Sequence, residues 1–375
     1  MGKEKIKFLV ISSAPTILEE GQLYAYSPYV DEMELWFKYC DYYKIISPSE
    51  YPNNFLSKPF QNKNIIRYKL PFLGFSSFKK SIISLCLIPS VVVKLFKAMY
   101  WANHIHFRCP GNIPFIASFM QVFFPSKTKS VKYAGNWDPK SKQPISYKIQ
   151  KYIFSNTLLT RNTKVLVYGY WPKQSINIKV FFTATFRENE IEDFFDRDYS
   201  SQLKFVFIGG LVSGKRPLLA LEIIKALQEK GLDCIIEVYG DGALKNELET
   251  YIGVNNLTDS VTLHGNQNRE VIKLALKQSH FTILPSKSEG WPKALAEGMF
   301  FGCIPISTKI SCVPWMLDDG KRGILIEAGL DDAVNEIQRV IKNENLNEMS
   351  KAAQLWSQEY TVEKQVSEIK KILAL

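Results

Sequence analysis

The amino-acid sequence predicts an α/β protein of two doubly wound domains, each a parallel β-sheet covered by helices, that face each other across a cleft. Three observations support this prediction. The chain has 375 residues, which is too long for one ordinary core and suits two domains. Short strand-like runs alternate with longer helical segments, and the alternation occurs in both halves. The balance of charges changes sign near the middle of the chain.

Six strands are predicted in each half from short runs rich in β-branched and aromatic residues. In the first half they are Ile6–Ile11, Tyr43–Ser47, Ile65–Leu70, His104–Arg108, Val131–Asn136 and Lys164–Tyr168. In the second half they are Lys204–Ile208, Cys234–Tyr239, Val261–His264, Phe281–Pro285, Ile304–Thr308 and Gly323–Glu327.

Amphipathic helices are predicted between these strands. Residues 217–230 form the clearest, because apolar residues recur there every three or four positions and Gly231 supplies a stop. The tail, residues 351–375, is predicted to be helical with a break at Tyr360 and Thr361.

Composition suggests the domain boundaries. Residues 188–202 are acidic and poorly periodic, and we interpret them as a linker. The first domain then spans residues 1–187 and the second, which would bind the ligand, residues 203–355. Residues 356–375 would form a C-terminal helix that can pack back on the first domain.

The charges are divided unequally between the halves. Residues 1–187 hold 26 basic and 9 acidic side chains, a balance of +17, whereas residues 188–375 have a balance of −7. The first half is therefore expected to face an anionic partner, such as nucleic acid, an anionic membrane surface or a phosphorylated acceptor. No nucleic-acid-binding signature accompanies the charge, so a nucleic-acid-binding protein is the least favoured of these readings.

The cysteines and histidines indicate no metal site. The six cysteines form no C-x-x-C pair, and there are only four histidines, so neither zinc nor a disulfide framework is indicated. Reduced thiols suit a cytoplasmic protein. The D-x-D of residues 196–198 lies in the acidic stretch and not after a buried strand, so we attribute it to chance.

One apolar stretch bears on membrane association. Residues 82–93 are apolar but interrupted by Pro89, and they fall short of the ~20 residues of a spanning helix. We therefore expect no integral span, and a place in the cytoplasm or at the inner face of the membrane. An interfacial helix on anionic lipid and a buried helix with a basic rim both remain open. The residues concerned are Phe72, Phe75, Phe78, Lys79, Lys80, the run 82–93, Lys94, Phe96 and Lys97.

The loop after the first strand of the second half is a candidate pyrophosphate cradle. Gly209 and Gly210 allow a ligand to approach the backbone, and the helix that follows offers free N–H groups at its N-terminus. Lys215 and Arg216 add positive charge. An ordinary glycine-rich turn has the same features, and Arg216 stands where a P-loop requires Ser or Thr. Gly240, after the next strand, lies in an Asp-Gly turn that is common in plain loops.

The segment 285–298 is the strongest candidate site. A strand ends at Pro285, a loop of small residues follows, and a helix is predicted to begin near Trp291. Glu289 then lies just before the helix, where its dipole favours a carboxylate, and Glu297 lies nearly two turns further on. Eight helical residues rise ~12 Å, which is outside the ~5–9.5 Å of a glycosidase carboxylate pair. The two glutamates must have different roles, and a solvated loop Glu with a helix-face Glu is the plain alternative.

Residues 288–298 resemble the E-x7-E signature of retaining GT-B glycosyltransferases of family 4, with Glu289 and Glu297 in the two acidic positions. The blocks 208–215, 239–242, 302–307 and 318–323 resemble consecutive blocks of that family in the same order. The resemblance covers about residues 204–330 and is weak in the first half. It implies a GT-B fold and transfer of a hexose from a UDP- or GDP-sugar to a glycan or lipid-linked glycan, without a metal.

The resemblance also implies roles for single residues. Lys215 would hold the donor pyrophosphate, Glu297 the ribose and Glu289 the transferred sugar. The full set of implied donor-binding residues is Gly209, Gly210, Lys215, Arg216, Gly240, Glu289, Gly290, Trp291, Leu295 and Glu297. Gly210 departs from the family, which usually has Arg there, and Arg216 is a substitute cation six residues later.

The first half contributes weaker candidates. His106 is near the carboxyl end of its strand and resembles a family histidine that approaches the reacting sugar, although a structural histidine is equally consistent. Arg108, Asn136 and Asp138 are acceptor-side candidates. A GT-B epimerase or phosphorylase is the alternative enzyme.

Overall fold

The computed structural model describes residues 5–50 and 57–375, which divide into two compact units. Unit 1 comprises Met1–Phe181 and Val366–Leu375, and unit 2 comprises Phe182–Gln365. The chain thus passes into unit 2 at Phe182, before the acidic stretch that the sequence suggested as a linker. Each unit is described below by itself.

The acidic stretch is held on unit 2 by partners far away in the sequence. Glu192 forms an ion pair with Lys277, and its carbonyl accepts hydrogen bonds from the amides of Gln354 and Gln358. The Arg197 backbone N–H donates to Asn347 Oδ1 at 2.9 Å. Acidic, aperiodic composition is typical of a linker, but these long-range contacts hold it in a fixed place.

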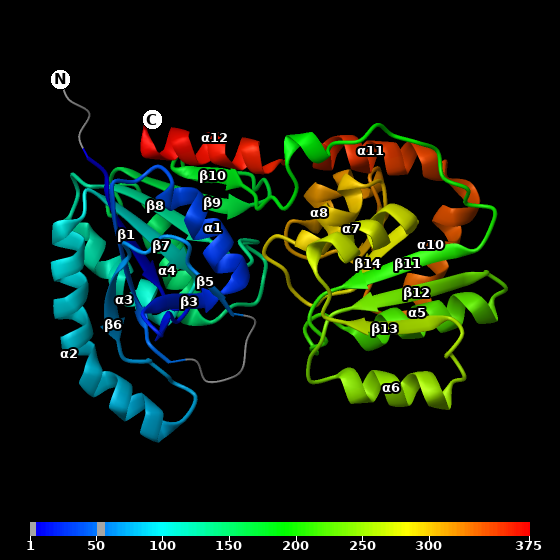
Figure 1. The fold of residues 1–375 in the computed structure, drawn as a ribbon, viewed down its shortest axis with the longest axis horizontal. Coiled ribbons are helices and arrows are strands. Elements are labelled where there is room, and N and C mark those ends of the chain that lie inside the picture. The colour runs from blue at the N-terminus through cyan, green and yellow to red at the C-terminus, as the bar shows by residue number, and fades with distance from the viewer. Residues whose placement is uncertain (1–4, 51–56) are drawn as a thin grey trace. The chain divides into compact units, whose positions relative to one another are not determined.

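Unit 1 contains a seven-stranded sheet with the order β10-β9-β8-β7-β1-β4-β6, in which every neighbouring pair is parallel (Figure 1). Its strands are β1 (Lys7–Ser12), β4 (Tyr42–Pro48), β6 (Ile66–Leu70), β7 (His104–Cys109), β8 (Thr128–Tyr133), β9 (Thr163–Tyr168) and β10 (Ile178–Phe181). A small antiparallel sheet of β2 (Ile17–Glu19), β3 (Gln22–Tyr26) and β5 (Ser57–Pro59) lies beside it.

Alternate residues of the strands pack into two separate cores, one on each face of the sheet. Phe8 and Val10 of β1 pack on one face, whereas Leu9 and Ile11 pack on the other. The first face is covered by α1 (Ser27–Phe37) and α12 (Val362–Leu373), the second by α2 (Phe78–Trp101), α3 (Asn112–Met120) and α4 (Ile145–Ser155). The short 3-10 helix η1 (Gln121–Phe123) continues α3.

The last helix completes unit 1. Ile369, Ile372 and Leu373 of α12 are buried in the core that contains Phe8. Each of these side chains contributes about 1.5–3 kcal/mol by its burial. Lys164 Nζ also donates to the Lys371 carbonyl at 2.7 Å.

Unit 1 also buries charged side chains between α1 and its sheet. Glu32 of α1 lies 2.6 Å from Arg108 and 3.1 Å from Lys132, and the Lys132 side chain is fully buried. Burial raises the pKa of Glu32, but the two cations outweigh it and the pKa falls to about 2. Lys129, also buried, donates to the Arg161 carbonyl at 2.8 Å. Lys129 looks like a surface residue in the sequence, so the predicted strand begins at Val131, three residues after the start of β8 at Thr128.

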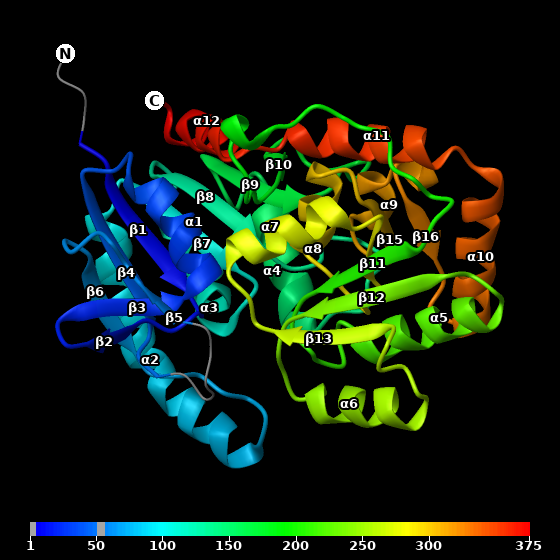
Figure 2. The ribbon, with the colours of Figure 1, turned by 45° about the vertical axis from the view of Figure 1, so that its right-hand side comes forward.

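Unit 2 contains a six-stranded parallel sheet with the order β13-β12-β11-β14-β15-β16 (Figure 2). The strands are β11 (Leu203–Ile208), β12 (Cys234–Tyr239), β13 (Val261–Gly265), β14 (Phe281–Leu284), β15 (Ile304–Thr308) and β16 (Ile324–Ile326). In chain order the sheet reads 3-2-1-4-5-6, the doubly wound arrangement.

Helices cover both faces of this sheet. On one side lie α5 (Pro217–Glu229), α6 (Lys245–Val254) and α10 (Leu330–Asn343), and on the other lie α7 (Arg269–Gln278), α8 (Lys293–Phe300) and α11 (Leu346–Gln358) (Figure 1). The shorter elements are η2 (Glu188–Glu190), α9 (Val313–Met316) and η3 (Asp318–Gly320). The predicted fold class is confirmed, and so is the helix break between α11 and α12. The sequence analysis missed β2, β3, β5 and β10, which are all short.

Two histidines of β7 share one hydroxyl inside unit 1. His104 Nε2 and His106 Nδ1 each lie 2.8 Å from Ser130 Oγ. A serine hydroxyl has one proton, so Ser130 donates to one ring and accepts from the other. Burial lowers the pKa of His104 to about 3 and lowers the pKa of His106 well below its usual value. Both rings are therefore neutral at neutral pH.

Unit 1 is expected to lose stability as the pH falls below the usual histidine pKa of 6.5. The unfolded chain then binds protons at His104 and His106, while the folded unit excludes them until about pH 3 at His104. Each histidine adds a slope of up to ~1.4 kcal/mol per pH unit. Urea unfolding of the wild type and of H104N/H106N, from neutral to mildly acidic pH, measures this slope. The double variant should be less stable but less pH-dependent, and equal slopes would contradict the assignment.

Candidate functional site

The site lies where the strand order of unit 2 reverses. β11 and β14 are neighbours, but the chain continues from β11 toward one edge of the sheet and from β14 toward the other. In doubly wound sheets, ligands bind beyond the carboxyl ends of the strands at such a point, so the loops that follow these two strands are where a ligand is expected. The sequence placed Lys215 in the first of these loops and Glu289 in the second.

An ion pair joins the two loops. Lys215 Nζ lies 2.5 Å from Glu289 Oε1, and the Lys287 backbone N–H donates to the Gly214 carbonyl at 2.8 Å. The Glu289 side chain is 8% exposed and the Lys215 side chain 31%. A nearly buried carboxylate requires such a partner. Because an ammonium has three donors, Lys215 can hold Glu289 and still bind a second anion.

Hydrogen bonds between its backbone and the side chains of Ser311 and Cys312 hold the loop around Glu289 in place. The Glu289 N–H donates to Ser311 Oγ at 3.2 Å, and Cys312 Sγ donates to the Gly290 carbonyl at 3.1 Å. Trp291 is buried, with its ring 5.7 Å from that of Tyr360. Pro292 then precedes α8, whose first turn has no side-chain cap among the described residues. The Leu295 and Ala296 N–H groups donate to the Pro292 carbonyl, so the N–H groups of Lys293 and Ala294 are the ones available to an anion.

Glu297 lies on α8, which packs closely on the sheet. A Cβ on Gly298 would come 2.0 Å from Thr282 Oγ1, so only glycine lets the helix approach β14 this far. Glu297 Oε1 accepts a hydrogen bond from Thr185 Oγ1 at 2.6 Å and lies 3.8 Å from Lys293 Nζ. Thr185, Trp291, Lys293 and Glu297 line one small pocket of unit 2.

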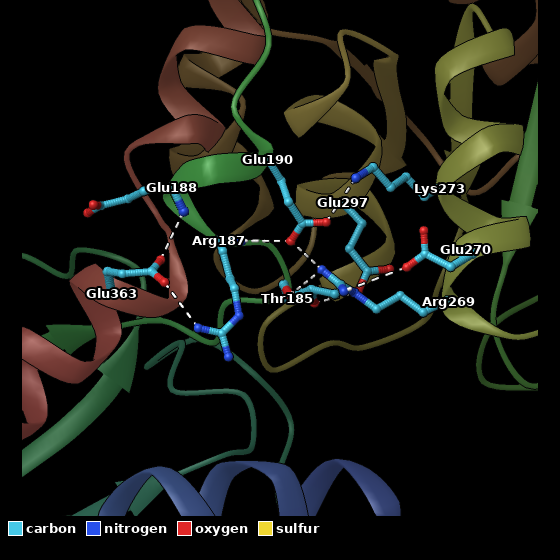
Figure 3. A network of polar contacts seen from close by, with 9 residues as sticks. All are labelled: Thr185, Arg187, Glu188, Glu190, Arg269, Glu270, Lys273, Glu297 and Glu363. Atoms are coloured by element: carbon cyan, nitrogen blue, oxygen red, sulfur yellow. Dashed lines mark hydrogen bonds and ion pairs between the residues drawn. The ribbon is translucent and has the colours of Figure 1, made fainter.

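Thr185 belongs to a segment that a polar network fastens to α7 (Figure 3). Arg269 donates to the Thr185 carbonyl at 3.3 Å and forms an ion pair with Glu190. Lys273 Nζ lies 2.9 Å from the same carboxylate. Burial raises the pKa of Glu190, but hydrogen bonds from Lys273, the Arg187 N–H and Arg269 lower it to about 2. The network thus fixes the segment that carries Thr185 beside Glu297.

Glu363 ties the same segment to the start of α12 (Figure 3). Its carboxylate accepts the Glu188 N–H at 2.9 Å and lies 3.2 Å from Arg187 NH1. Sequence analysis did not identify Thr185, Glu190 or Ser311. The hydrogen bond from Thr185 to Glu297 joins residues 112 positions apart, so no local pattern could have indicated it.

The glycines after β11 and β12 let the two loops pair beyond the sheet. The Gly209 N–H donates to the Tyr239 carbonyl at 2.9 Å, and the Leu211 N–H to the Asp241 carbonyl at 3.0 Å. Gly240 has φ +141°, and a Cβ there would come 1.9 Å from the Gly209 carbonyl oxygen. Gly240 therefore has an architectural role that its Asp-Gly turn did not reveal.

Three other donor-side candidates differ in position. Gly210 is exposed, and a Cβ there would come no closer than 3.9 Å to the Asp241 carbonyl oxygen, which leaves room for a larger residue. Arg216 precedes α5 in the left-handed conformation, with φ 51°. Leu295 is fully buried in the core, away from solvent.

The candidates of unit 1 do not lie at an open surface. His106 is fully buried, and its ring packs 4.5 Å from that of Trp36. It thus lies inside the unit and not exposed at the strand end, because α1 covers this face of β7. Arg108 is engaged with Glu32.

The loop after β8 forms local turns. Asn136 Oδ1 accepts the Asp138 N–H, and Asp138 Oδ1 accepts the Lys140 N–H, both at 2.8 Å. Both side chains are half-buried. Among the described residues no cluster of three or more His, Cys, Asp or Glu could hold a metal ion.

Comparison with known proteins shows what unit 2 is similar to. Residues 189–356 match the family described as "Glycosyl transferases group 1". An uncharacterised glycosyltransferase of Methanocaldococcus jannaschii is 26% identical over 169 residues, 44% of this chain and 46% of that protein. The UDP-Gal:α-D-GlcNAc-diphosphoundecaprenol α-1,3-galactosyltransferase of Escherichia coli is 34% identical over 151 residues, 39% of this chain and 38% of that protein. These matches span less than half the length of either relative.

Solved structures extend the likeness to the whole chain at the level of the fold. HepE of Anabaena, solved in complex with UDP, matches 99% of this chain and 100% of its own, with a TM-score of 0.69 and 14% identity. The predicted GT-B fold is thereby confirmed, and the match of residues 189–356 confirms the predicted resemblance to a glycosyltransferase family.

Replacing Gly240 with Ala is expected to destabilise unit 2 by about 1–3 kcal/mol or more, because the new Cβ would collide with Gly209. Gly253→Ala is the matched control, since nothing lies within 4 Å of a Cβ at that position of α6 and alanine favours the helix. Denaturant unfolding monitors both variants. Equal stability of G240A and the wild type would show that the two loops are not closely paired.

Proposed function

We propose that this chain, whose residues 189–356 match glycosyl transferases group 1, is a retaining hexosyltransferase. It moves a hexose from a nucleotide diphosphate sugar to a hydroxyl of a glycan or lipid-linked glycan. The observation that carries the proposal is the Lys215–Glu289 pair at the point where the strand order reverses, inside the matched region.

The donor pyrophosphate is assigned to Lys215 and the start of α8. Lys215 remains 31% exposed beside Glu289, and α8 offers the N–H groups of Lys293 and Ala294. The backbone at Gly290 and Trp291 lies between them. Gly209 and Gly210 give the phosphates access to the backbone, and Arg216 adds charge beside them. Together these groups supply the positive field that a diphosphate needs.

The two glutamates bind different parts of the donor. Glu289, nearly buried at the carboxyl end of β14, receives hydroxyls of the transferred sugar. Glu297 receives the ribose hydroxyls, because one of its oxygens already accepts Thr185 and the other is left for the ligand. A carboxylate has up to four acceptor positions, so both contacts are compatible.

The reaction breaks the bond between the anomeric carbon and the β-phosphate oxygen and forms a bond from that carbon to the acceptor oxygen. The acceptor proton passes to the leaving phosphate on the same face of the sugar, which gives retention. Lys215 and the N–H groups of α8 stabilise the charge that develops on the diphosphate. His106 is buried and takes no part in this proposal.

The names of the relatives support a UDP-sugar and a lipid-linked acceptor. The Escherichia coli relative is a UDP-Gal transferase that acts on a diphosphoundecaprenol-linked sugar, and HepE was solved with UDP. GDP-sugars fit the same pyrophosphate site. We place the protein in the cytoplasm, at the inner face of the membrane, in the synthesis of a surface polysaccharide or glycolipid. Arg108, Asn136 and Asp138 are the acceptor-side candidates.

A GT-B epimerase or phosphorylase is the alternative enzyme. Release of nucleotide diphosphate only in the presence of acceptor is expected of a transferase. Release without acceptor points to the alternative.

Glu289→Gln is expected to lower kcat about 10²-fold or more while nucleotide binding is retained, because the amide keeps an oxygen for Lys215 but loses the charge assigned to the transferred sugar. Glu297→Ala is expected to weaken nucleotide binding about tenfold or more through the loss of the ribose hydrogen bonds. Thermal shifts with UDP-, GDP- and ADP-sugars measure binding, and nucleotide release measures turnover. Glu249→Gln, on the exposed face of α6, is the control. Wild-type behaviour of both site variants would refute the site.

Thr185→Val is expected to raise the donor KM several-fold with little change in kcat, because the Glu297 carboxylate loses the hydrogen bond that orients it. Thr185→Ser keeps the hydroxyl and should restore the KM. If Thr185 had only a structural role, Thr185→Val would lower the thermal stability and leave the KM of the folded protein unchanged.

A further inference from the structure

Helix α2 is long, apolar and continuous. It runs from Phe78 to Trp101 without a break at Pro89, where the sequence suggested an interruption. Within the described ranges, it is the helix that is long and apolar enough to cross a membrane by length and composition. The sequence-based expectation of an apolar run too short to span is therefore wrong on length.

Only one face of α2 is packed on unit 1. Val91, Leu95, Ala98 and Met99 are buried in the core beneath the sheet, whereas Ser84 is the one buried residue in the first half of the helix. Figures 1 and 2 show this first half, drawn in cyan, extending past the sheet of unit 1. The alternative of a buried helix thus does not hold for this half.

The opposite face carries a continuous exposed apolar stripe. Its members are spaced by three or four residues, so they lie along one side of the helix. They are Phe78, Ile82, Leu85, Pro89, Val93, Phe96 and Tyr100, and all are exposed, Phe78 at 83%. We call this set the outer stripe.

Lysines border the outer stripe on one side. Lys79, Lys94 and Lys97 are exposed, and each directly follows a member of the stripe, so they line the same flank. The helix contains four lysines and no acidic residue. The flank therefore carries positive charge near both ends of the helix, on a unit that is itself strongly basic.

Neighbouring aromatic residues extend the apolar surface. Phe96 of the outer stripe contacts Phe124, with ring centroids 5.0 Å apart, and the adjoining Phe123 is 74% exposed. Phe72 and Phe75, which precede α2, are about half exposed. A surface of this kind is a docking site, because large aromatic side chains are rarely left together in water.

We propose that the outer stripe of α2 docks unit 1 on a phospholipid membrane rich in anionic headgroups. The helix lies in the plane of the interface, with the stripe among the acyl chains and the lysines at the phosphates. It does not cross the bilayer, because its other face is part of the core of unit 1. The occupant is lipid and not a second copy, since two copies would bring lysine flanks together without carboxylates to pair them.

This surface is independent of donor binding in unit 2. It gives the proposed transferase access to acceptors held in the membrane, so docking and donor recognition can be tested separately.

The test is cosedimentation of the whole chain with vesicles of phosphatidylcholine alone or of an equal mixture with phosphatidylglycerol. Binding to the mixture is expected to be about tenfold tighter or more, and to weaken with salt. The double variant F78S/L85S should lose about tenfold or more of this binding. Val254→Ser, which replaces a 77% exposed residue on α6, should bind as the wild type does.

Three results with vesicles would overturn the proposal. These are absence of binding to the mixed vesicles, wild-type binding by F78S/L85S, and resistance of bound protein to alkaline extraction, which marks a spanning helix. A lipid-free dimer that F78S/L85S abolishes would also overturn it, by assigning the stripe to a second copy. Thermal shifts with nucleotide sugars, measured without vesicles, should be the same for F78S/L85S and the wild type. Failure of donor binding is thus distinguished from failure of docking.

Discussion

The ion pair between Lys215 and Glu289 is the interaction on which the arrangement of the second unit depends. It connects the two loops that leave the sheet in opposite directions, and both charged groups are drawn partly out of water to form it. The two loops start close together, because β11 and β14 are hydrogen-bonded neighbours in the sheet. Glycines then supply the close packing, at Gly240 between the loops and at Gly298 beneath α8. A rigid frame thus holds a flexible ammonium beside a nearly buried carboxylate.

The two units use buried charge in different ways. In unit 1, Glu32 of α1 pairs with both Arg108 and Lys132 of the sheet, and removing Glu32 would leave these two buried cations without their shared carboxylate. In unit 2, Lys215 and Glu289 lie at the rim, where a ligand can reach them. Polar residues near strand ends therefore do not identify a ligand site by themselves, since the same residue types occur in a closed core and in an open site.

The sequence predicted the fold class well, because parallel strands covered on both faces leave continuous apolar runs. It located Lys215, Glu289 and Glu297 through the loops and spacing that carry them. It could not show that His106 is buried, since alternation along a strand gives the face but not what covers that face. It also could not indicate Thr185, whose contact depends on how distant segments fold together. The start of β8 was missed because its lysines look like surface residues until their buried partners are known.

Unit 1 is assembled from two separate stretches of chain, and the second is the final helix. During synthesis the ribosome therefore releases the whole of unit 2 before α12 can cover the face of β1 that holds Phe8. Until then α1 alone of the two helices covers that face, and the apolar surface that α12 will bury stays exposed. Unit 2 is thus the first of the two units to have its whole sequence synthesised, although unit 1 begins earlier in the chain.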